Sequence, residues 1–443
     1  MKTKRDGIFS IIVMTLTLAI LACSLSPSTI LFGTPTPTAT ATFTQTPSPT
    51  PTMTPEPINI KVISSLPMAG GNLQTEAIVN AEKLRLSQSN YSACNGRYTI
   101  SFEAWDDADT DTQRWSPDRE AENAEFAAAD PSVIAYLATF NSGAALVSIP
   151  ITNQAGPLVM ISPSNTNPTL TKLDTTTLEN LAKLYPSGTR NYARVTTADD
   201  VQGNVAARFI QSRLNAETVY ILDDGDIYGS ILADSFETTA EEIGLTVLGR
   251  ESINPNDRDY RLIMNNIAES NNGHPPDVIY VSMVYNNNAA QVLKDKIAVM
   301  GDNTKVRFVG PDGLFVQDFL NEAGTENAQG VFVSSIGLDF KEFPAKGQQF
   351  LLEYEAEYKN EADYYAIYGY EVMSVLLQAI ENICMEGGDA TNRETVRAAV
   401  FAITEFSGVL GTWSFDENGD TSLTDMTFYE VQDGEFISDG SYR

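Results

Sequence analysis

Short polar side chains follow several apolar segments of this sequence at the point where each segment ends. Ser164 and Thr166 come after the run LVMIS, and Asn141 and Ser142 come after the run VIAYLAT. Hydroxyl groups, amides and the free N–H groups at the start of a helix are suited to hold a carboxylate. Each such residue, taken singly, is more commonly a helix cap. The prediction of a carboxylate site therefore depends on several segments ending in this way.

A second set of residues supplies groups that a carboxylate site lacks. Asp312 follows the run KVRFVG, Tyr228 and Tyr285 follow two other apolar runs, and Tyr365 stands in the stretch YYAIYGYEV. A single acid can pair with an ammonium group, and tyrosine rings can enclose an apolar side chain. Together the two sets predict a site for a small zwitterion, which carries both an ammonium and a carboxylate group.

Groups that serve in catalysis or metal binding are scarce. The chain has one histidine, His274, in the loop-like sequence NNGHPPD, so we expect neither a histidine-rich zinc site nor a serine or cysteine triad. The stretch from Asp107 to Asp118 spaces its acids like a calcium loop, but it lacks glycine at the sixth position and glutamate at the twelfth. We expect a turn there, and no catalytic residue, metal or cofactor.

Composition limits the partners of the protein. The chain has 443 residues, of which 42% are hydrophobic, and this length suggests two or three domains. It carries 28 Lys and Arg against 58 Asp and Glu, for a net charge of −30. Such a charge repels phosphate backbones, so we expect no nucleic-acid partner.

Apolar strand-like runs alternate with amphipathic runs from residue 58 onward. The strand-like runs are almost continuously apolar, which is typical of strands buried on both faces of a parallel sheet. Helical runs between them indicate right-handed crossovers. The expected strands are 58–64, 99–105, 133–139 and 158–162, and the expected helices are about 74–88, 118–129 and 142–155.

The alternation starts again near residue 194, which predicts a second α/β unit of similar size. Residues 344–403 indicate mainly helices, and the C-terminal segment indicates short strands with an Asn-Gly hairpin turn. Because helices without strands must pack on an existing sheet, we expect two α/β lobes rather than three domains. The chain should cross between the lobes near 191–197, 336–343 and 405–411.

The N-terminus has the pattern of an export signal. A basic start is followed by 15 apolar residues, 8–22, and then by Cys23. Fifteen residues are short for a membrane-spanning helix, which needs about 20. The pattern resembles the bacterial lipoprotein signal, in which the cysteine carries the lipid. An uncleaved anchor and ordinary secretion are the alternatives.

A stretch rich in threonine and proline, 34–57, follows this signal and is expected to be an extended tether. The two remaining cysteines, Cys94 and Cys384, are predicted to form a disulfide, because the protein is expected to be exported. The expected organisation is a signal peptide over 1–22, a lipid-anchored linker over 23–57, a first lobe over 58–193 and 340–408, and a second lobe over 194–339 and 409–443.

Nine segments occur in the order of a known family. They are SSLPMAG, EAWDDAD, FNSGAALVSIPI, ISPSNTNPTLT, RVTTADDVQG, LDDGDIYGS, FVGPDGLF, YYAIYGYEVMSVLLQAI and GTWSFDENGD. Through them residues 58–443 resemble the branched-chain amino-acid-binding (Leu/Ile/Val-binding) family of periplasmic binding proteins, the substrate receptors of ABC importers. The resemblance implies a type I periplasmic-binding-protein fold, with two Rossmann-like parallel-sheet lobes joined by a three-strand hinge and a ligand between them.

The resemblance also implies roles for particular residues. In the family, the segments that match FNSG and SPSNT hold the ligand carboxylate, which implies contacts from Asn141 or Ser142 and from Ser164 and Thr166. Thr166 would also help to hold the ammonium group.

In the same way, Asp312 matches a family acid that pairs with the ammonium group. Tyr228 matches an aromatic residue of the second lobe that closes over the ligand, and Tyr285 and Tyr365 are looser matches. The chain departs from the family in having Asn141 where many relatives have serine, and in having Asp312 where the best-known relatives have glutamate. The loop MAGGNLQTEA also lacks an aromatic residue that often covers the side chain of the ligand.

The function that these features imply is an extracytoplasmic lipoprotein that binds a small amino acid, branched-chain or similar, and delivers it to the permease subunits of an ABC importer. It would be held at the outer face of the membrane by its lipid. The alternatives are a ligand-sensing receptor of the same fold, for an amide or another small polar solute, and a secreted enzyme on an α/β scaffold.

Overall fold

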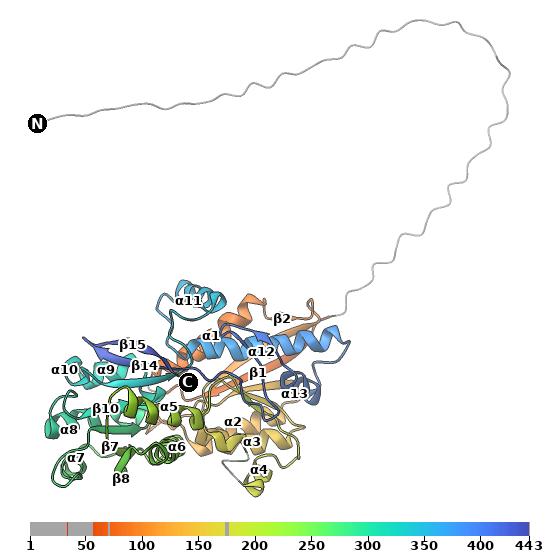
Figure 1. Cartoon of the computed structure of the whole chain (residues 1–443). Coiled ribbons are helices and arrows are strands. Elements are labelled where there is room, and N and C mark those ends of the chain that lie inside the picture. Colours follow the sequence, from red (N-terminus) through yellow and green to blue (C-terminus); the bar gives the residue numbers. More distant parts are fainter. Residues whose placement is uncertain (1–32, 34–55, 70, 173–176, 443) are drawn as a thin grey trace, which may run out of the picture. The chain divides into compact units, whose positions relative to one another are not determined.

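The computed structural model describes residues 33, 56–69, 71–172 and 177–442 (Figure 1). The predicted signal peptide, Cys23 and nearly all of the predicted tether lie outside these residues. Within the described part of the chain, no helix is both long and apolar enough to cross a membrane.

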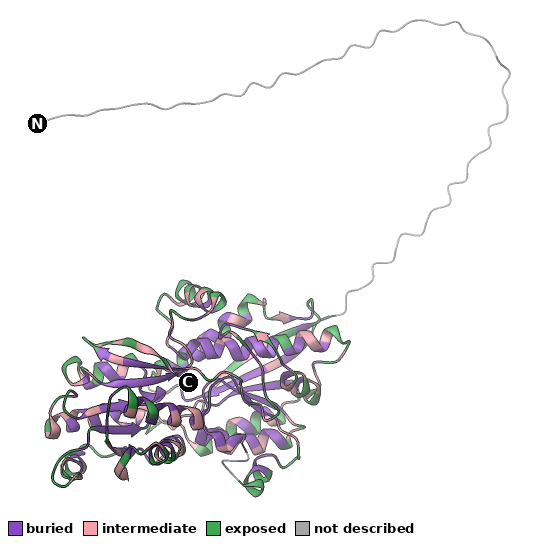
Figure 2. Ribbon diagram, viewed as in Figure 1, coloured by how far each residue is buried: buried purple, intermediate pink, exposed green. Residues whose placement is uncertain are grey.

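The first lobe is built on a six-stranded sheet in the order β2-β3-β1-β4-β5-β6. All neighbouring strands are parallel except β2 and β3. Every residue of β4 and β5 is buried, as Figure 2 shows for the centre of this sheet. The strands are β1 (Ile58–Leu66), β2 (Ser92–Ala93), β3 (Tyr98–Asp106), β4 (Val133–Ala138), β5 (Val159–Ser162) and β6 (Tyr192–Arg194).

Helices cover this sheet, and α1 and α12 lie side by side (Figure 1). Their close approach requires Gly369, because a Cβ atom there would lie 2.4 Å from the carbonyl oxygen of Ile78. A disulfide between Cys94 and Cys384 fastens the end of α12 to the edge of the sheet. The helices are α1 (Leu73–Gln88), α2 (Pro117–Ala129), α3 (Ser142–Gln154), α4 (Leu178–Leu184), α11 (Ala345–Tyr358), α12 (Ala366–Met385) and α13 (Arg393–Phe401), with the 3-10 turn η1 (Pro168–Leu170).

The second lobe is built on a seven-stranded sheet in the order β15-β14-β11-β10-β9-β7-β8. The five strands from β11 to β8 are parallel, and β14 and β15 add an antiparallel edge. The strands are β7 (Thr218–Asp223), β8 (Thr246–Ser252), β9 (Val278–Ser282), β10 (Arg307–Gly310), β11 (Phe332–Ile336), β14 (Met426–Gln432) and β15 (Glu435–Tyr442). The predicted pair of parallel α/β lobes is therefore confirmed.

Two groups of helices accompany the second sheet. Helices α5 and α6 pack against each other, and α7 to α10 form a connected group. The bounds are α5 (Asp199–Ser212), α6 (Ile227–Ile243), α7 (Arg261–Ala268), α8 (Ala289–Met300), α9 (Gln317–Ala323) and α10 (Thr325–Ala328), with the 3-10 turns η2 (Tyr285–Asn287) and η3 (Asp312–Leu314).

Three segments carry the chain between the lobes. The first follows β6 and the second follows β11. The third lies near 421–425 and not at 405–411, because residues before it still contact the first lobe. Glu371 of α12 accepts hydrogen bonds from Val409 N (3.0 Å) and Trp413 Nε1 (2.8 Å), next to the short strands β12 (Phe406–Ser407) and β13 (Thr412–Trp413).

The C-terminal segment contains two turns, one at the predicted Asn-Gly pair and one that was not predicted. Strands β14 and β15 are joined at Asp433 and Gly434, which both have positive φ (53° and 86°). The predicted Asn418-Gly419 pair lies in a hairpin turn, in which Phe415 and Thr421 form an antiparallel bridge and Asp416 N donates to Asp420 O at 2.8 Å. This turn places the side chain of Asp420 at the first lobe, where it has a structural role described below.

Candidate functional site

The loop after β5 is fixed by its own serine. The Ser162 hydroxyl accepts hydrogen bonds from Ser164 N (3.1 Å) and Asn165 N (2.8 Å), and it donates to Thr139 O (2.9 Å). The Ser164 hydroxyl donates to Thr139 O (3.2 Å) and Phe140 O (3.1 Å). The loop after β5 is therefore bonded directly to the loop after β4. The two predicted carboxylate-binding segments lie side by side.

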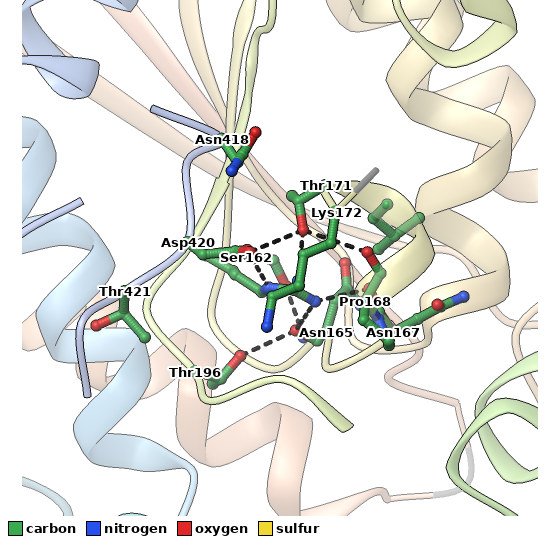
Figure 3. Close-up of polar contacts among 12 residues, drawn as sticks. Ser162, Asn165, Asn167, Pro168, Thr171, Lys172, Thr196, Asn418, Asp420 and Thr421 are labelled. Carbon is green, nitrogen blue, oxygen red and sulfur yellow. Dashed lines mark hydrogen bonds and ion pairs between the residues drawn. The ribbon is translucent and has the colours of Figure 1, made fainter. Parts of the chain in front are cut away.

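A buried arginine is bonded to the same loop, and Figure 3 labels three of its partners, Asn167, Thr171 and Asp420. Arg194, at the end of β6, forms an ion pair with Asp420 (2.7 Å) and donates to Asn167 O (2.7 Å) and Thr171 Oγ1 (2.6 Å). Thr196 Oγ1 donates to the carbonyl of Asn165 at 2.9 Å. These bonds fix the backbone carbonyls of the loop. Sequence reasoning missed Arg194, because its ion-pair partner is 226 residues away.

The N-terminus of α3 provides donors for a carboxylate. Asn141 is its N-cap residue, yet the Asn141 side chain makes no capping hydrogen bond. The Ser142 hydroxyl accepts from Asn167 N at 3.3 Å, which connects the helix start to the loop after β5. Because the amides of Ser142 and Gly143 begin the helix, this end suits a negative group. Simple capping thus does not explain Asn141.

The opposite wall is centred on Asp312 in η3. This buried side chain accepts hydrogen bonds from Tyr228 OH (2.7 Å) and Gln202 Nε2 (2.7 Å), both from the second lobe. It also accepts a hydrogen bond from Tyr365 OH, at the start of α12 of the first lobe. The Tyr365 ring packs edge-on against Phe140, with 5.3 Å between ring centroids. The structure therefore brings Tyr228, Asp312 and Tyr365 together, next to the loop that contains Asn141.

A second carboxylate, Asp199, joins this group and was not predicted. Its backbone N–H donates to Thr166 O at 2.7 Å, whereas neither side-chain oxygen of this buried residue has a hydrogen-bond partner among the described residues. Burial, and then the nearby Asp312, raise the pKa of Asp199 well above its usual value. In the sequence, Asp199 looks like an ordinary acid in the first turn of a helix, so no local signal marks it.

Tyr285 lies apart from these residues. It lines a different cavity of about 450 Å³, together with charged residues from both lobes. Burial, and then Glu322 and Asp318, raise the pKa of Tyr285 to about 12. The structure therefore brings seven of the eight predicted ligand-binding residues into one connected group and leaves Tyr285 outside it.

Two side chains from the turn after β3 reach across to the second lobe. Trp115 Nε1 donates to Asp226 Oδ2 at 3.0 Å, and Arg114 donates to Asn256 Oδ1 (3.2 Å) and Pro255 O (3.3 Å). The Trp115 ring covers the start of α3, because a Cβ atom at Gly143 would lie 2.5 Å from it. Trp115 thus places an aromatic ring over the start of α3. The loop after β1, where the sequence resemblance led us to look for an aromatic residue, has none.

The space beside this cover is small. A cavity of about 20 Å³ is lined by Trp115, Phe140, Asn141 and Asp226, and it has room for about one water molecule.

The stretch of acids from Asp107 to Asp118 folds as a turn, because Asp109 accepts hydrogen bonds from Asp111 N (3.0 Å) and Thr112 N (2.9 Å). Within the described residues, no group of three or more acids, cysteines or histidines is arranged to hold a metal ion.

The protein has two sheets of mainly parallel strands, each covered by helices, three segments that cross between the lobes, and a group of polar residues between them. This is the architecture of a bilobed binding protein. The model of the family described as periplasmic binding protein matches residues 60–435. The chain belongs to this family.

Individual relatives are distant in sequence. The Leu/Ile/Val-binding protein BraC3 of Rhizobium johnstonii is 24% identical over 294 residues, which cover 66% of this chain and 72% of that protein. Among solved structures, the branched-chain amino acid transporter substrate binding protein LivJ of Streptococcus pneumoniae, in complex with isoleucine, has a TM-score of 0.71 at 20% identity and covers 86% of this chain and 98% of its own. A solute binding protein of an ABC transporter from R. palustris, in complex with benzoate, has a TM-score of 0.69 at 20% identity and covers 86% and 96%. At such identities these structures establish the fold.

Proposed function

We propose that this protein is the extracytoplasmic substrate-binding lipoprotein of an ABC importer, and that it binds a small amino acid, branched-chain or similar, between its lobes. The observation that carries the proposal is the opposite chemistry of the two walls. Neutral donors at the start of α3 belong to the first lobe, whereas two buried acids, Asp312 and Asp199, belong to the second. A zwitterion satisfies both walls at once, whereas a simple anion or a neutral solute satisfies only one.

In this proposal the first lobe binds the carboxylate through the start of α3, Ser142 and Ser164. Ser164 must turn its hydroxyl away from the carbonyls of Thr139 and Phe140 to donate to the ligand. The second lobe then closes and brings Asp312 and Tyr228 to the ammonium group. Because the ligand contacts both walls only when the lobes are together, it stabilises the closed arrangement.

The contacts at the mouth of the cleft support this order of events. The bonds from Trp115 to Asp226 and from Arg114 to Asn256 join the two lobes and can form only on closure. A branched-chain amino acid is several times larger than the 20 Å³ cavity. Ligand entry therefore needs the lobes further apart, or the lining side chains moved, with Trp115 closing over the ligand afterwards.

Calorimetric titration with three compounds tests the requirement for both charges. L-leucine has both groups, 4-methylpentanoate lacks the ammonium group and 3-methylbutylamine lacks the carboxylate. Each missing charged hydrogen bond should cost about 1.5–3 kcal/mol, or about ten- to 150-fold in affinity. Equal binding of leucine and 4-methylpentanoate would contradict the proposal.

The second candidate is a sensor of the same fold for an amide or another small polar solute. The benzoate complex of a neighbour with the same fold shows that this architecture accommodates a ligand without an ammonium group. A thermal-shift screen with branched-chain amino acids, leucinamide and benzoate separates the candidates, because a ligand of the folded state raises the melting temperature by mass action. A shift with leucinamide or benzoate, and none with any amino acid, would favour the sensor.

The lipid anchor and the permease complete the proposal. Cys23 directly follows the apolar segment of the signal, and the family position of the protein supports an extracytoplasmic location. A Cys23→Ser variant expressed as the full chain should move from the membrane fraction to the soluble fraction. Retention of this variant in the membrane would instead favour an uncleaved anchor.

A further inference from the structure

A second cavity between the lobes, of about 520 Å³, has a chemistry unlike that of the cleft. Its first-lobe side is formed by α1, the end of α11 and residues 360–364, and its second-lobe side by residues 315–317 and Phe436. The volume falls within the range of about 300–1,000 Å³ that is usual for small-molecule sites. Its walls do not include the predicted carboxylate-binding residues.

Aromatic rings make up much of the wall. Phe315 packs edge-on against Tyr364 (5.2 Å, 82°), and Phe340 packs at a steep angle against the same ring (5.3 Å, 68°). Rings that meet at steep angles turn their faces in different directions, as in the aromatic cages that hold ammonium groups. The six aromatic residues are Phe315, Phe340, Tyr354, Tyr358, Tyr364 and Phe436.

Two of the three tyrosine hydroxyls in the wall, those of Tyr358 and Tyr364, have partners within the protein. Tyr358 OH donates to Asn80 O at 2.7 Å, and Tyr364 OH donates to Leu338 O at 2.9 Å and to Ile336 O. At these two residues a ligand in the cavity therefore meets no free hydroxyl donor. Such a surface offers little to the carboxylate of an amino acid.

The charges in the wall are all negative. Glu76, Glu361 and Asp363 line the cavity, and the described lining residues include no lysine, arginine or histidine. None of the three acids forms an ion pair with a described residue. Asp363 accepts a hydrogen bond from Tyr365 N (3.0 Å). Burial raises the pKa of Asp363 to about 7, so the surroundings do not stabilise the ionised form.

These groups select one class of ligand. Three acids without a basic partner repel an anion. Glu76 and Glu361 are exposed, but a neutral apolar molecule would further desolvate Asp363 without any compensating charge. A cation with an apolar body compensates the acids and packs on the rings. We propose that this cavity is a second binding site, separate from the amino-acid cleft, for an organic monocation that carries an apolar group and no carboxylate.

Three probes of nearly the same shape test the proposal by calorimetric titration of the full chain at neutral pH. They are 2-phenylethylamine, which is a cation, 2-phenylethanol, which is neutral, and 3-phenylpropionate, which is an anion. The cation should bind at least about tenfold more tightly than either of the others. Equal binding of the cation and the alcohol, or no binding of the cation, would overturn the proposal.

Two variants show where the cation binds. Asp363→Asn keeps an acceptor for Tyr365 N, so it should fold, and it should weaken binding of 2-phenylethylamine at least about fivefold. The matched control Glu357→Gln removes an exposed acid of the same helix region that does not line the cavity, and it should leave binding unchanged. Equal losses of affinity in both variants would show that general electrostatic attraction, and not a site in this cavity, holds the cation. That result would overturn the proposal.

The amine could also enter the cleft beside Asp312, so the titration is repeated in Asp312→Asn. Binding of 2-phenylethylamine should persist in Asp312→Asn and be weakened in Asp363→Asn. The reverse pattern would assign the amine to the cleft and overturn the second site. Because the probes carry no amino-acid carboxylate, failure here would leave the proposed amino-acid function intact.

Discussion

The two walls of the cleft differ in how completely their polar groups are satisfied. On the first lobe, neutral hydroxyls and amides are bonded to backbone groups, and the loop after β5 is fixed by Ser162 and Arg194. On the opposite side, two acids are buried with no basic partner, and the side chain of Asp199 has no hydrogen-bond partner among the described residues. The first wall is thus preorganised. The second wall carries a desolvation cost that an arriving cation would offset.

This difference gives the two walls different expected sensitivities. A change that loosens the first wall should act on the stability of the fold, because the wall is held by internal bonds. A change in the second wall should act on ligand affinity and its pH dependence, because its two acids have no basic partner in the unliganded protein. The following variants test this division.

Replacement of Arg194 by methionine should have the largest effect. It leaves Asp420 buried without its partner and releases the carbonyl of Asn167, so we expect a loss of about 3–5 kcal/mol in the free energy of unfolding. Urea unfolding followed by circular dichroism measures this. The control is Arg213→Met, since the Arg213–Asp439 pair is half-exposed on the arginine side and should contribute no more than about 1 kcal/mol. Equal losses in the free energy of unfolding of the two variants would contradict the structural role assigned to Arg194.

Replacement of Asp312 by asparagine should act on binding rather than on folding. The variant keeps the size and an acceptor oxygen but removes the charge, so affinity for leucine should fall tenfold or more, as expected for a charged hydrogen bond of about 1.5–3 kcal/mol. Calorimetric titration measures the affinity, with the exposed Glu326→Gln of the same lobe as the control. Unchanged affinity in Asp312→Asn would disprove the assigned pairing with the ammonium group.

Asp199 should couple binding to pH. The raised pKa of Asp199 favours its protonated form in the free protein, and an ammonium group nearby favours the ionised form, so binding should release protons and affinity should rise with pH. The free energy of unfolding of the unliganded protein should fall as pH rises, because Asp199 ionises at a lower pH in the unfolded chain than in the folded protein. Titration in buffers of different ionisation enthalpy measures the released protons. Asp199→Asn should abolish the release, and an unchanged release would place its source elsewhere.

The smallest expected effect is that of Trp115→Phe. This variant keeps an aromatic cover over α3 but removes the interlobe bond to Asp226, worth about 0.5–1.5 kcal/mol. Leucine should therefore dissociate about two- to tenfold faster in stopped-flow measurements. The control is Trp105→Phe, which removes a bond to Glu103 within one strand and should not change the rate.

Much of the fold and part of the site follow from the sequence. The two series of apolar runs predicted both parallel sheets, because strands buried on both faces are continuously apolar and helices between them must cross over. The polar residues after these runs were predicted to converge, because the carboxyl ends of parallel strands lie at one edge of a sheet. That reasoning placed Ser164, Thr166, Asp312 and Tyr285 in one group, whereas Tyr285 lines another cavity in the structure.

The sequence by itself determined the two α/β lobes and most of the polar residues that meet between them, since both depend on local periodicity and on where each strand ends. Only the tertiary structure decided that Arg194 pairs with Asp420, that Asp199 is buried without a side-chain partner and that Trp115 covers the cleft. The physical reason is that these features depend on burial and on contacts between residues far apart in the chain, and no local pattern of residue types records them.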